Sequence, residues 1–258
     1  MTPRTPHATL IECAGWFRGT LLDAQPLRVD AFCEPLDGYC GDFIGLYRPS
    51  PNVVLGVIAD ACGHGAEAAA LLEAATEPSS DVPLSGRSPA ELLEAFGAGV
   101  AARAGAVDGK FITAMVFTLD MQSGVLTVAL AGHPPPVLVQ QGKLIARSWP
   151  AGLPVGVDST IGAEDITIQL SLGDAVVAFT DGVADARAVA DETFGFEGAR
   201  TMLGDAARST DPVAAVLRVL GADQQRDWQA DDTTAMFIRF GDVEHASEIG
   251  TGEAWTPR

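Results

Sequence analysis

Short apolar runs bounded by turn residues dominate the first half of the chain after residue 27, a pattern typical of β-strands. The runs RVDAFCEP, GDFIGLY and VVLGVIAD follow one another, and residues 49–52 (PSPN) separate the last two. This pattern predicts a hairpin whose tip lies near residue 50. Residues 1–27 lack such a pattern, and we expect an extension there with a short helix around Ile11 to Leu22.

Stretches rich in Ala, Leu and Glu predict helices. The first, GAEAAALLEAA, follows the hairpin and contains no helix breaker. The second starts after Ser88, which is placed to cap it, with Pro89 at the first helical position and Glu91 completing a capping box. The later stretches FGFEGARTMLG and DPVAAVLRVLGA predict two more helices.

A second strand pair, FITAMVFTLD and GVLTVALAG, is joined by the turn MQSG, and further strands are expected at PVLVQ, DITIQL, DAVVAFTD and TTAMFIRF. Strand pairs joined by tight turns indicate antiparallel sheets, and helices grouped along the sequence indicate the class α+β. We expect helices covering a sheet sandwich, one domain over residues 28–240, and a flexible tail over residues 241–258 with little apolar content.

Net charge and cysteine spacing limit the classes of partner and the cellular compartment that we expect. The chain has 34 acidic and 16 basic residues, a formal charge of −18, which opposes binding to nucleic acid or to an anionic membrane surface. The four cysteines form no C-x-x-C pair, so we expect reduced thiols in a cytoplasmic protein. Because the N-terminus has no long apolar run and prolines at 134–136 break the longest uncharged stretch, we expect neither secretion nor a membrane span.

Aspartates stand at the ends of several predicted strands. Asp42 opens one arm of the hairpin and Asp60 closes the other, so a turn centred near residue 50 or 51 places them nearly opposite each other. Asp181 ends a strand in AFTDG, and Asp231 and Asp232 begin the last strand. Clustered carboxylates repel one another and imply a cation, and oxygen ligands favour Mg²⁺ or Mn²⁺ over zinc. Taken singly, each aspartate is better explained by a structural role as a turn cap.

Seven short motifs carry a resemblance to a known family. They are CGDF (40–43), DACGHG (60–65), AGHPPP (131–136), LPVGV (153–157), FTDGVADAR (179–187), FG (194–195) and DDTT (231–234). In this order they resemble the metal-dependent serine/threonine phosphatases of the PPM, or protein phosphatase 2C, type. More narrowly, they resemble the bacterial branch typified by stage II sporulation protein E. The resemblance covers about residues 28–240 and identifies that range as a PPM-type phosphatase domain.

The resemblance implies an αββα four-layer sandwich, with two antiparallel sheets between helical layers and two divalent cations, Mn²⁺ or Mg²⁺, at one edge. Carried over to this sequence, the metal ligands, which act in catalysis through the metals, are Asp42, Asp60, Asp181 and Asp231, with the backbone carbonyl of Ala61 beside them. Asp232 is not expected to be a ligand, because the family pattern uses the first acid of the DDTT motif.

The activity that the resemblance implies is hydrolysis of phosphoserine or phosphothreonine on a regulatory protein, for which the branch suggests an anti-sigma-factor antagonist. Two bound ions can lower the pKa of a bridging water, and the hydroxide then attacks phosphorus directly. The expected partner is a phosphorylated protein, and a homodimer is left open. Two alternatives also stay open: a weak or inactive member of the fold that binds a partner, and a hydrolase of small phosphomonoesters.

The chain departs from the family pattern at three positions near these motifs. Cys40 stands where relatives usually have glycine, Gly45 where they have an acid, and Cys62 where serine is commoner. These changes remove no expected ligand and bear on a third, accessory metal. We expect His133 to have a structural role and His64 to form hydrogen bonds in its turn, ahead of any acid–base role.

Overall fold

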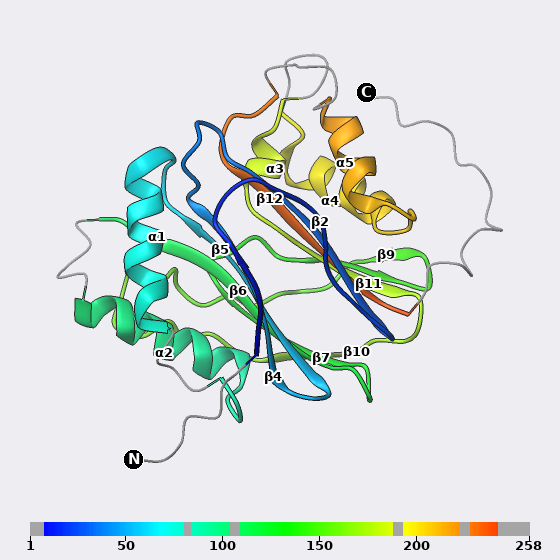
Figure 1. Cartoon of the computed structure of the whole chain (residues 1–258), viewed down its shortest axis with the longest axis horizontal. Helices are drawn as coiled ribbons and strands as arrows, with labels where there is room; N and C mark the ends of the chain where they lie inside the picture. The colour runs from blue at the N-terminus through cyan, green and yellow to red at the C-terminus, as the bar shows by residue number, and fades with distance from the viewer. Residues whose placement is uncertain (1–7, 80–83, 104–108, 188–192, 222–227, 242–258) are drawn as a thin grey trace.

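In the computed structural model, two antiparallel β-sheets face each other and helices cover the outer side of each sheet (Figure 1). The structure describes residues 8–79, 84–103, 109–187, 193–221 and 228–241. The fold is the α+β, αββα sandwich that the sequence predicts.

The first sheet contains six strands in the order β1 (Ala8–Cys13), β4 (Asp42–Ser50), β5 (Val53–Ala61), β6 (Ile112–Asp120), β7 (Val125–Ala131) and β10 (Ile166–Gln169). The second sheet also contains six, in the order β2 (Phe17–Ala24), β3 (Leu27–Glu34), β12 (Thr233–Phe240), β11 (Asp174–Phe179), β8 (Val137–Gln140) and β9 (Lys143–Ile145). All neighbouring strands are antiparallel, so the predicted strand pairing is confirmed.

Helices α1 (Gly65–Ser79) and α2 (Pro89–Arg103) lie on the first sheet, whereas α3 (Gly182–Asp185), α4 (Gly195–Ala206) and α5 (Pro212–Leu220) lie on the second (Figure 1). Each sheet is therefore buried on both faces. On β3, Val29 and Ala31 face the core between the sheets, while Phe32 faces the layer under the helices. Because both alternating faces are buried, these strands read as nearly continuous apolar runs.

Two helix starts follow the capping rules. The backbone N–H of Ser88 donates to Glu91 Oε2 at 2.9 Å, and the N–H of Glu91 donates to Ser88 Oγ at 3.3 Å. The predicted capping box of α2 is therefore confirmed. At α5, Asp211 accepts from the N–H of Ala214, and Pro212 occupies the first turn.

The helix expected around Ile11 to Leu22 is wrong, because β1 and β2 occupy this stretch. β1 pairs with β4 at the edge of the first sheet, and β2 pairs with β3 at the edge of the second. Gly19 has a φ of 148°, outside the helical region, and exposure along β2 largely alternates with a period of two. The stretch expected as an extension thus contributes one strand to each sheet. Of the predicted tail, only Gly241 lies within the described residues.

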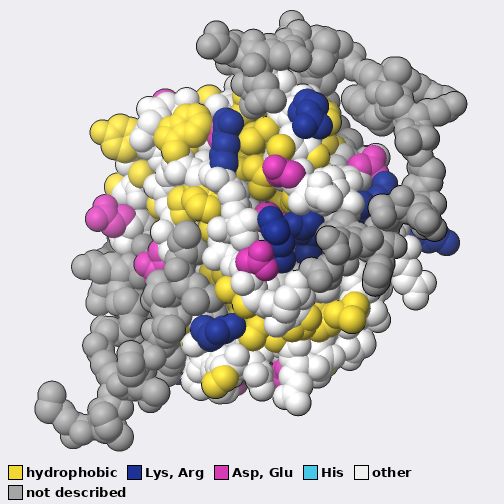
Figure 2. All heavy atoms as spheres, turned by 45° about the vertical axis from the view of Figure 1, so that its right-hand side comes forward, with side chains coloured by type: hydrophobic (Ala, Val, Ile, Leu, Met, Phe, Trp, Pro, Cys, Tyr) yellow, Lys and Arg dark blue, Asp and Glu magenta, His cyan; other side chains and the backbone are white. Residues whose placement is uncertain are grey.

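The surface carries charges of both signs. On the face drawn in Figure 2, Lys and Arg side chains lie among Asp and Glu side chains, with hydrophobic side chains between them. Large exposed apolar side chains include Trp16, Tyr39, Leu172 and Phe196. Among the described helices, none is both long and apolar enough to cross a membrane.

Candidate metal centre

Two carboxylates face each other at one end of the β4–β5 hairpin. Asp42, the first residue of β4, is paired in register with Asp60, the last but one residue of β5. The turn between Ser50 and Val53, together with a register shift between Tyr47 and Ser50, sets this register. The hairpin and the juxtaposition of Asp42 and Asp60 are as the sequence predicts.

The second sheet brings two further aspartates to one of its ends. β11 and β12 are antiparallel neighbours, and Phe179 at the end of β11 lies opposite Ala235 near the start of β12. Asp181, two residues beyond β11, and Asp231, two residues before β12, therefore leave the same end of the sheet. The charge of Asp181 acts on both Asp60 and Asp231, so the two sheets bring their acids into one cluster.

A threonine joins the two sheets at this cluster. The Thr180 hydroxyl donates to Asp42 Oδ2 at 2.9 Å, and Thr180 Oγ1 itself accepts from the backbone N–H of Thr234 at 3.0 Å. Asp42 lies on the first sheet, while Thr180 and Thr234 belong to the second. The position of the Asp42 carboxylate is therefore tied to both sheets.

Burial and mutual repulsion disfavour the ionised form of the clustered acids. Burial raises the pKa of Asp42 well above its usual range, and the charge of Asp60 adds to this shift. Burial also raises the pKa of Asp60 to about 8, with further contributions from the charges of Asp181 and Asp231. Without cations, this end of the sandwich is therefore electrostatically strained.

The two outer acids follow the same trend. Burial raises the pKa of Asp181, and the charge of Asp185 adds to it. Burial also raises the pKa of Asp231; the hydrogen bond from the N–H of Asp232 opposes this shift and the charge of Asp181 adds to it. All four predicted ligand carboxylates thus have a raised pKa, which is the behaviour of acids placed for a cation.

The donor atoms fit a hard divalent ion. Asp42 Oδ1 is buried and has no hydrogen-bond partner among the described residues, which is costly for a carboxylate unless a cation neutralises it. The Ala61 carbonyl follows Asp60 directly, and its N–H is held by the Gly41 carbonyl at 2.9 Å. Within the described ranges, no three His, Cys, Asp or Glu side chains already stand in metal-binding geometry. The carboxylates are neighbours without forming a finished coordination sphere.

Asp232 has a different task from its neighbour Asp231. Its Oδ1 accepts from the backbone N–H of Leu36 and its Oδ2 from that of Gly41, both at 2.7 Å. The side chain therefore holds the segment that leads into β4 and Asp42. This positioning role was not predicted from the sequence, because the partner backbone lies almost two hundred residues away in the chain.

The two histidines near the cluster differ in exposure. His64 is exposed, and its Nδ1 lies 3.8 Å from Asp37 Oδ2. His133 is buried, and its Nδ1 shares a hydrogen bond of 2.9 Å with Thr113 Oγ1; Thr113 pairs in register with Asp60. Burial lowers the pKa of His133 to about 3, so its ring is neutral at physiological pH. A structural role for His133 agrees with this environment.

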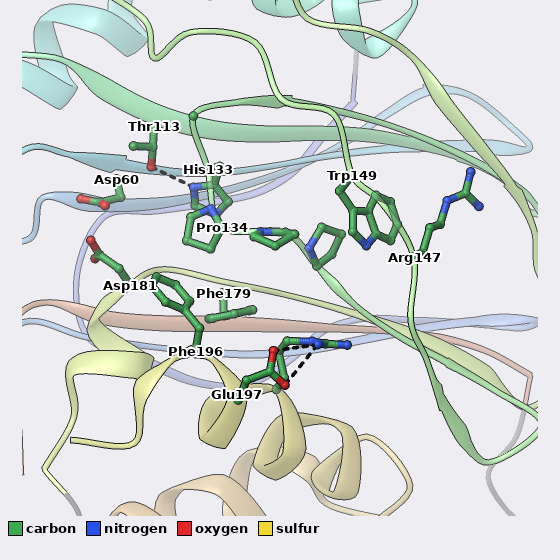
Figure 3. Close-up of a pocket in the computed structure, with 14 residues that line it drawn as sticks. Asp60, Thr113, His133, Pro134, Arg147, Trp149, Phe179, Asp181, Phe196 and Glu197 are labelled. Carbon is green, nitrogen blue, oxygen red and sulfur yellow. Dashed lines mark hydrogen bonds and ion pairs between the residues drawn. The ribbon is translucent and has the colours of Figure 1, made fainter. Parts of the chain in front are cut away.

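A cavity of about 420 Å³ opens beside Asp60 and Asp181 (Figure 3). The segment after β7, the segment after β9 and the first turns of α4 form its walls. Besides the two aspartates, its lining residues are Thr113, Gly132, His133, Pro134, Pro135, Pro136, Arg147, Trp149, Phe179, Phe196, Glu197 and Arg200. The cavity therefore opens onto two of the four clustered aspartates.

Comparison with known proteins shows which family the sequence matches. Residues 50–241 match the family described as Stage II sporulation protein E (SpoIIE). The phosphoserine phosphatase RsbU of Bacillus subtilis is 26% identical over 183 residues, which are 69% of this chain and 54% of that protein. The chain thus spans about half the length of this curated relative.

Solved structures share the fold at lower identity. The SiaA-PP2C domain of Pseudomonas aeruginosa has a TM-score of 0.72 and 22% identity, over 82% of this chain and 85% of that domain. RsbX, solved in complex with magnesium, has a TM-score of 0.63 and 13% identity, over 87% of this chain and 100% of that chain. These likenesses support the PP2C-like sandwich.

Proposed function

Since the chain belongs to the stage II sporulation protein E family, we propose that it is a metal-dependent phosphatase that removes phosphate from serine or threonine of a regulatory protein. The observation that carries this proposal is the meeting of two carboxylates from each sheet beside a cavity. The similarity to a phosphoserine phosphatase supports the reaction. An anti-sigma-factor antagonist is the substrate that we propose by analogy with the branch.

Two divalent cations, Mg²⁺ or Mn²⁺, would be held by Asp42, Asp60, Asp181, Asp231 and the Ala61 carbonyl. Such ions supply Lewis-acid stabilisation for a phosphoryl group and activate water at neutral pH. The RsbX structure in complex with magnesium supports a divalent ion in this fold. Oxygen donors alone are the ligand set that hard ions prefer.

The residues of the chain itself orient the site and set its protonation. Thr180 donates a hydrogen bond to one oxygen of Asp42, and the other oxygen is buried with no hydrogen-bond partner among the residues that the structure describes. The Asp60 carboxyl retains its proton up to about pH 8 in the absence of cations, and it must release that proton to become a ligand. Asp232 keeps the β4 entry in place through two backbone hydrogen bonds.

A cytoplasmic location and a protein partner belong to the same proposal. All four cysteines are free, which supports a reducing compartment. The charge of −18 disfavours nucleic acid and anionic membranes as partners. Self-association as a homodimer stays a hypothesis, which light scattering of the purified chain would test.

Activity is tested with p-nitrophenyl phosphate and a phosphoserine peptide in the presence of Mn²⁺. We expect turnover that EDTA abolishes, and a loss of at least about a hundredfold in Asp181→Asn, because charge stabilisation at the transferred phosphoryl group supplies most of the catalysis. Asp23→Asn, which removes an exposed carboxylate on β2, is the control. Equal turnover by Asp181→Asn, or none by the wild type, contradicts the proposal, and free phosphomonoesters turned over faster than the peptide favour a small-molecule hydrolase.

Metal binding is tested independently of turnover by thermal unfolding. At a free Mn²⁺ concentration a hundred times the dissociation constant, we expect stabilisation by about 2.7 kcal/mol, because the ion binds only the folded cluster. EDTA should reverse the rise in melting temperature. A melting temperature that responds to neither reagent argues for the alternative of an inactive fold that only binds a partner.

A further inference from the structure

The cavity beside the acidic cluster has two chemically different ends. Asp60 and Asp181 lie at one end, and Arg147 and Trp149 lie at the other, with His133 and Pro134 between them (Figure 3). A phosphate bound at the aspartate end would leave the arginine end for another part of the same substrate.

Arg147 carries a positive charge that the described residues do not neutralise. Its guanidinium carbon lies 5.4 Å from the centroid of the Trp149 ring, and its Nη2 donates to the Thr167 carbonyl at 3.4 Å. No carboxylate of the described ranges forms an ion pair with it. In contrast, Arg200 on the opposite wall pairs with Glu197 at 3.1 Å. Arg147 is therefore held in place by an aromatic ring and a carbonyl, with its charge available to a ligand.

Apolar surfaces line the cavity between its two ends. Trp149 is partly buried, and its side chain is held in place by packing against the core between the sheets. On the other wall, Phe196 at the start of α4 is 51% exposed. Pro134, Pro135 and Pro136 add a stiff wall without backbone N–H groups. Such a surface suits a polypeptide segment, because it offers contacts that a phosphoserine side chain alone does not reach.

We propose that this cavity binds the polypeptide on either side of the phosphorylated residue and that Arg147 pairs there with an acidic side chain of the substrate. This inference rests on the proposed function and specifies its substrate class: phosphoproteins with Asp or Glu close in sequence to the phosphoserine. The overall charge of −18 repels an acidic segment, so any preference for one must come from a local positive charge. Arg147 is a specificity residue and takes no part in the chemistry.

The test uses two phosphoserine peptides that differ only within four residues of the phosphoserine, where one carries Glu and the other Gln. The measured quantity is the ratio of their kcat/KM values with Mn²⁺. For the wild type we expect a preference of about fivefold for the Glu peptide, the size of one exposed ion pair. In Arg147→Gln the ratio should fall to about one. Arg87→Gln, which removes an exposed arginine that does not line the cavity, should keep the wild-type ratio.

A charge swap separates direct pairing from general damage to the site. Arg147→Glu should prefer a third peptide with Lys in place of Glu, because the reversed charge restores the pair. A ratio near one in the wild type, or the same ratio in wild type and Arg147→Gln, overturns the inference.

The experiments distinguish an error in the peptide-binding role of the cavity from an error in the proposed function. If the wild type hydrolyses p-nitrophenyl phosphate but does not distinguish the peptides, the proposed role of the cavity and Arg147 is wrong and the proposed function stands. If the wild type hydrolyses none of the substrates, the proposed function is wrong. Fluorescence anisotropy of labelled peptides then still tests whether the cavity binds them. The proposed role of Arg147 is supported if the wild type binds the Glu peptide more tightly than the Gln peptide and Arg147→Gln loses this preference. Equal binding of both peptides by the wild type overturns it.

Discussion

Asp60→Asn is expected to lower phosphatase activity by at least about a hundredfold and, at the same time, to raise the melting temperature of the metal-free protein at pH 8. Activity should fall because a carboxylate proposed as a metal ligand is lost from the cluster. Stability rises because burial and the neighbouring charges raise the pKa of Asp60 to about 8, so ionising this group in the folded protein is unfavourable. Function and stability therefore change in opposite directions.

The stability effect should depend on pH in a defined way. Well below the usual value of 3.8, the Asp60 carboxyl is protonated in both the folded and the unfolded chain, so it costs no stability. Between the usual value of 3.8 and about 8, the unfolded chain ionises first and the folded state holds the extra proton. The stability of the metal-free wild type therefore falls as pH rises through this window, and the full cost is present above pH 8.

Thermal unfolding in EDTA at pH 4, 6 and 8 measures this effect. The gap in melting temperature between Asp60→Asn and the wild type should be small at pH 4 and reach about 5–10 °C at pH 8, as expected for a few kcal/mol in a domain of this size. Asp23→Asn, on the exposed side of β2, should show no such gap. A mutant that melts with the wild type at pH 8 would show that the cluster is not strained.

Gly182→Ala is expected to destabilise the protein by about 2 kcal/mol or more and to reduce activity with it. Gly182 follows Asp181 and begins α3, and a Cβ added there would lie 2.0 Å from the backbone carbonyl oxygen of Asp232. Because that contact is to backbone, a side-chain rotation cannot relieve it. The turn after β11 and the start of β12 must separate, which moves Asp181 away from Asp231.

Gly198→Ala is a matched control for this substitution. Gly198 lies within α4, where an added Cβ would meet Phe194 Cβ at 3.5 Å, an ordinary contact. Because alanine favours a helix more than glycine does, this variant should be as stable as the wild type or slightly more stable. The measurements are chemical denaturation and turnover with Mn²⁺. A Gly182→Ala protein with wild-type stability and rate would contradict the close packing described for this turn.

The part of the site that the sequence predicts depends on local rules. The approximate alignment of Asp42 and Asp60 follows from the position of the hairpin tip, and a register shift between Tyr47 and Ser50, which the sequence does not indicate, brings the two residues directly opposite each other. The aspartates that flank β11 and β12 are visible because they interrupt apolar runs. Likewise, the capping box at Ser88 needs only four consecutive residues.

Other features depend on partners that are distant in the sequence. The sequences of β1 and β2 show little apolar periodicity. Each is an edge strand with one partner, and each has a break in register, at Thr9 to Ile11 in β1 and at Thr20 to Leu22 in β2. Their pairing with β4 and β3 overrides the weak local pattern. The cavity is built from segments that are far apart in the sequence, so no single motif indicates that Arg147 and Phe196 line the same cavity.

The hydrogen bond from Thr180 to Asp42 crosses from one sheet to the other, so the distances among the acids depend on how the two sheets are seated. Loosening the apolar layer between the sheets would leave every strand pair intact and yet spread the donor oxygens apart. Cation affinity is thereby a reporter of tertiary order: it would be lost in a partly folded state that keeps its secondary structure, well before the strands themselves separate.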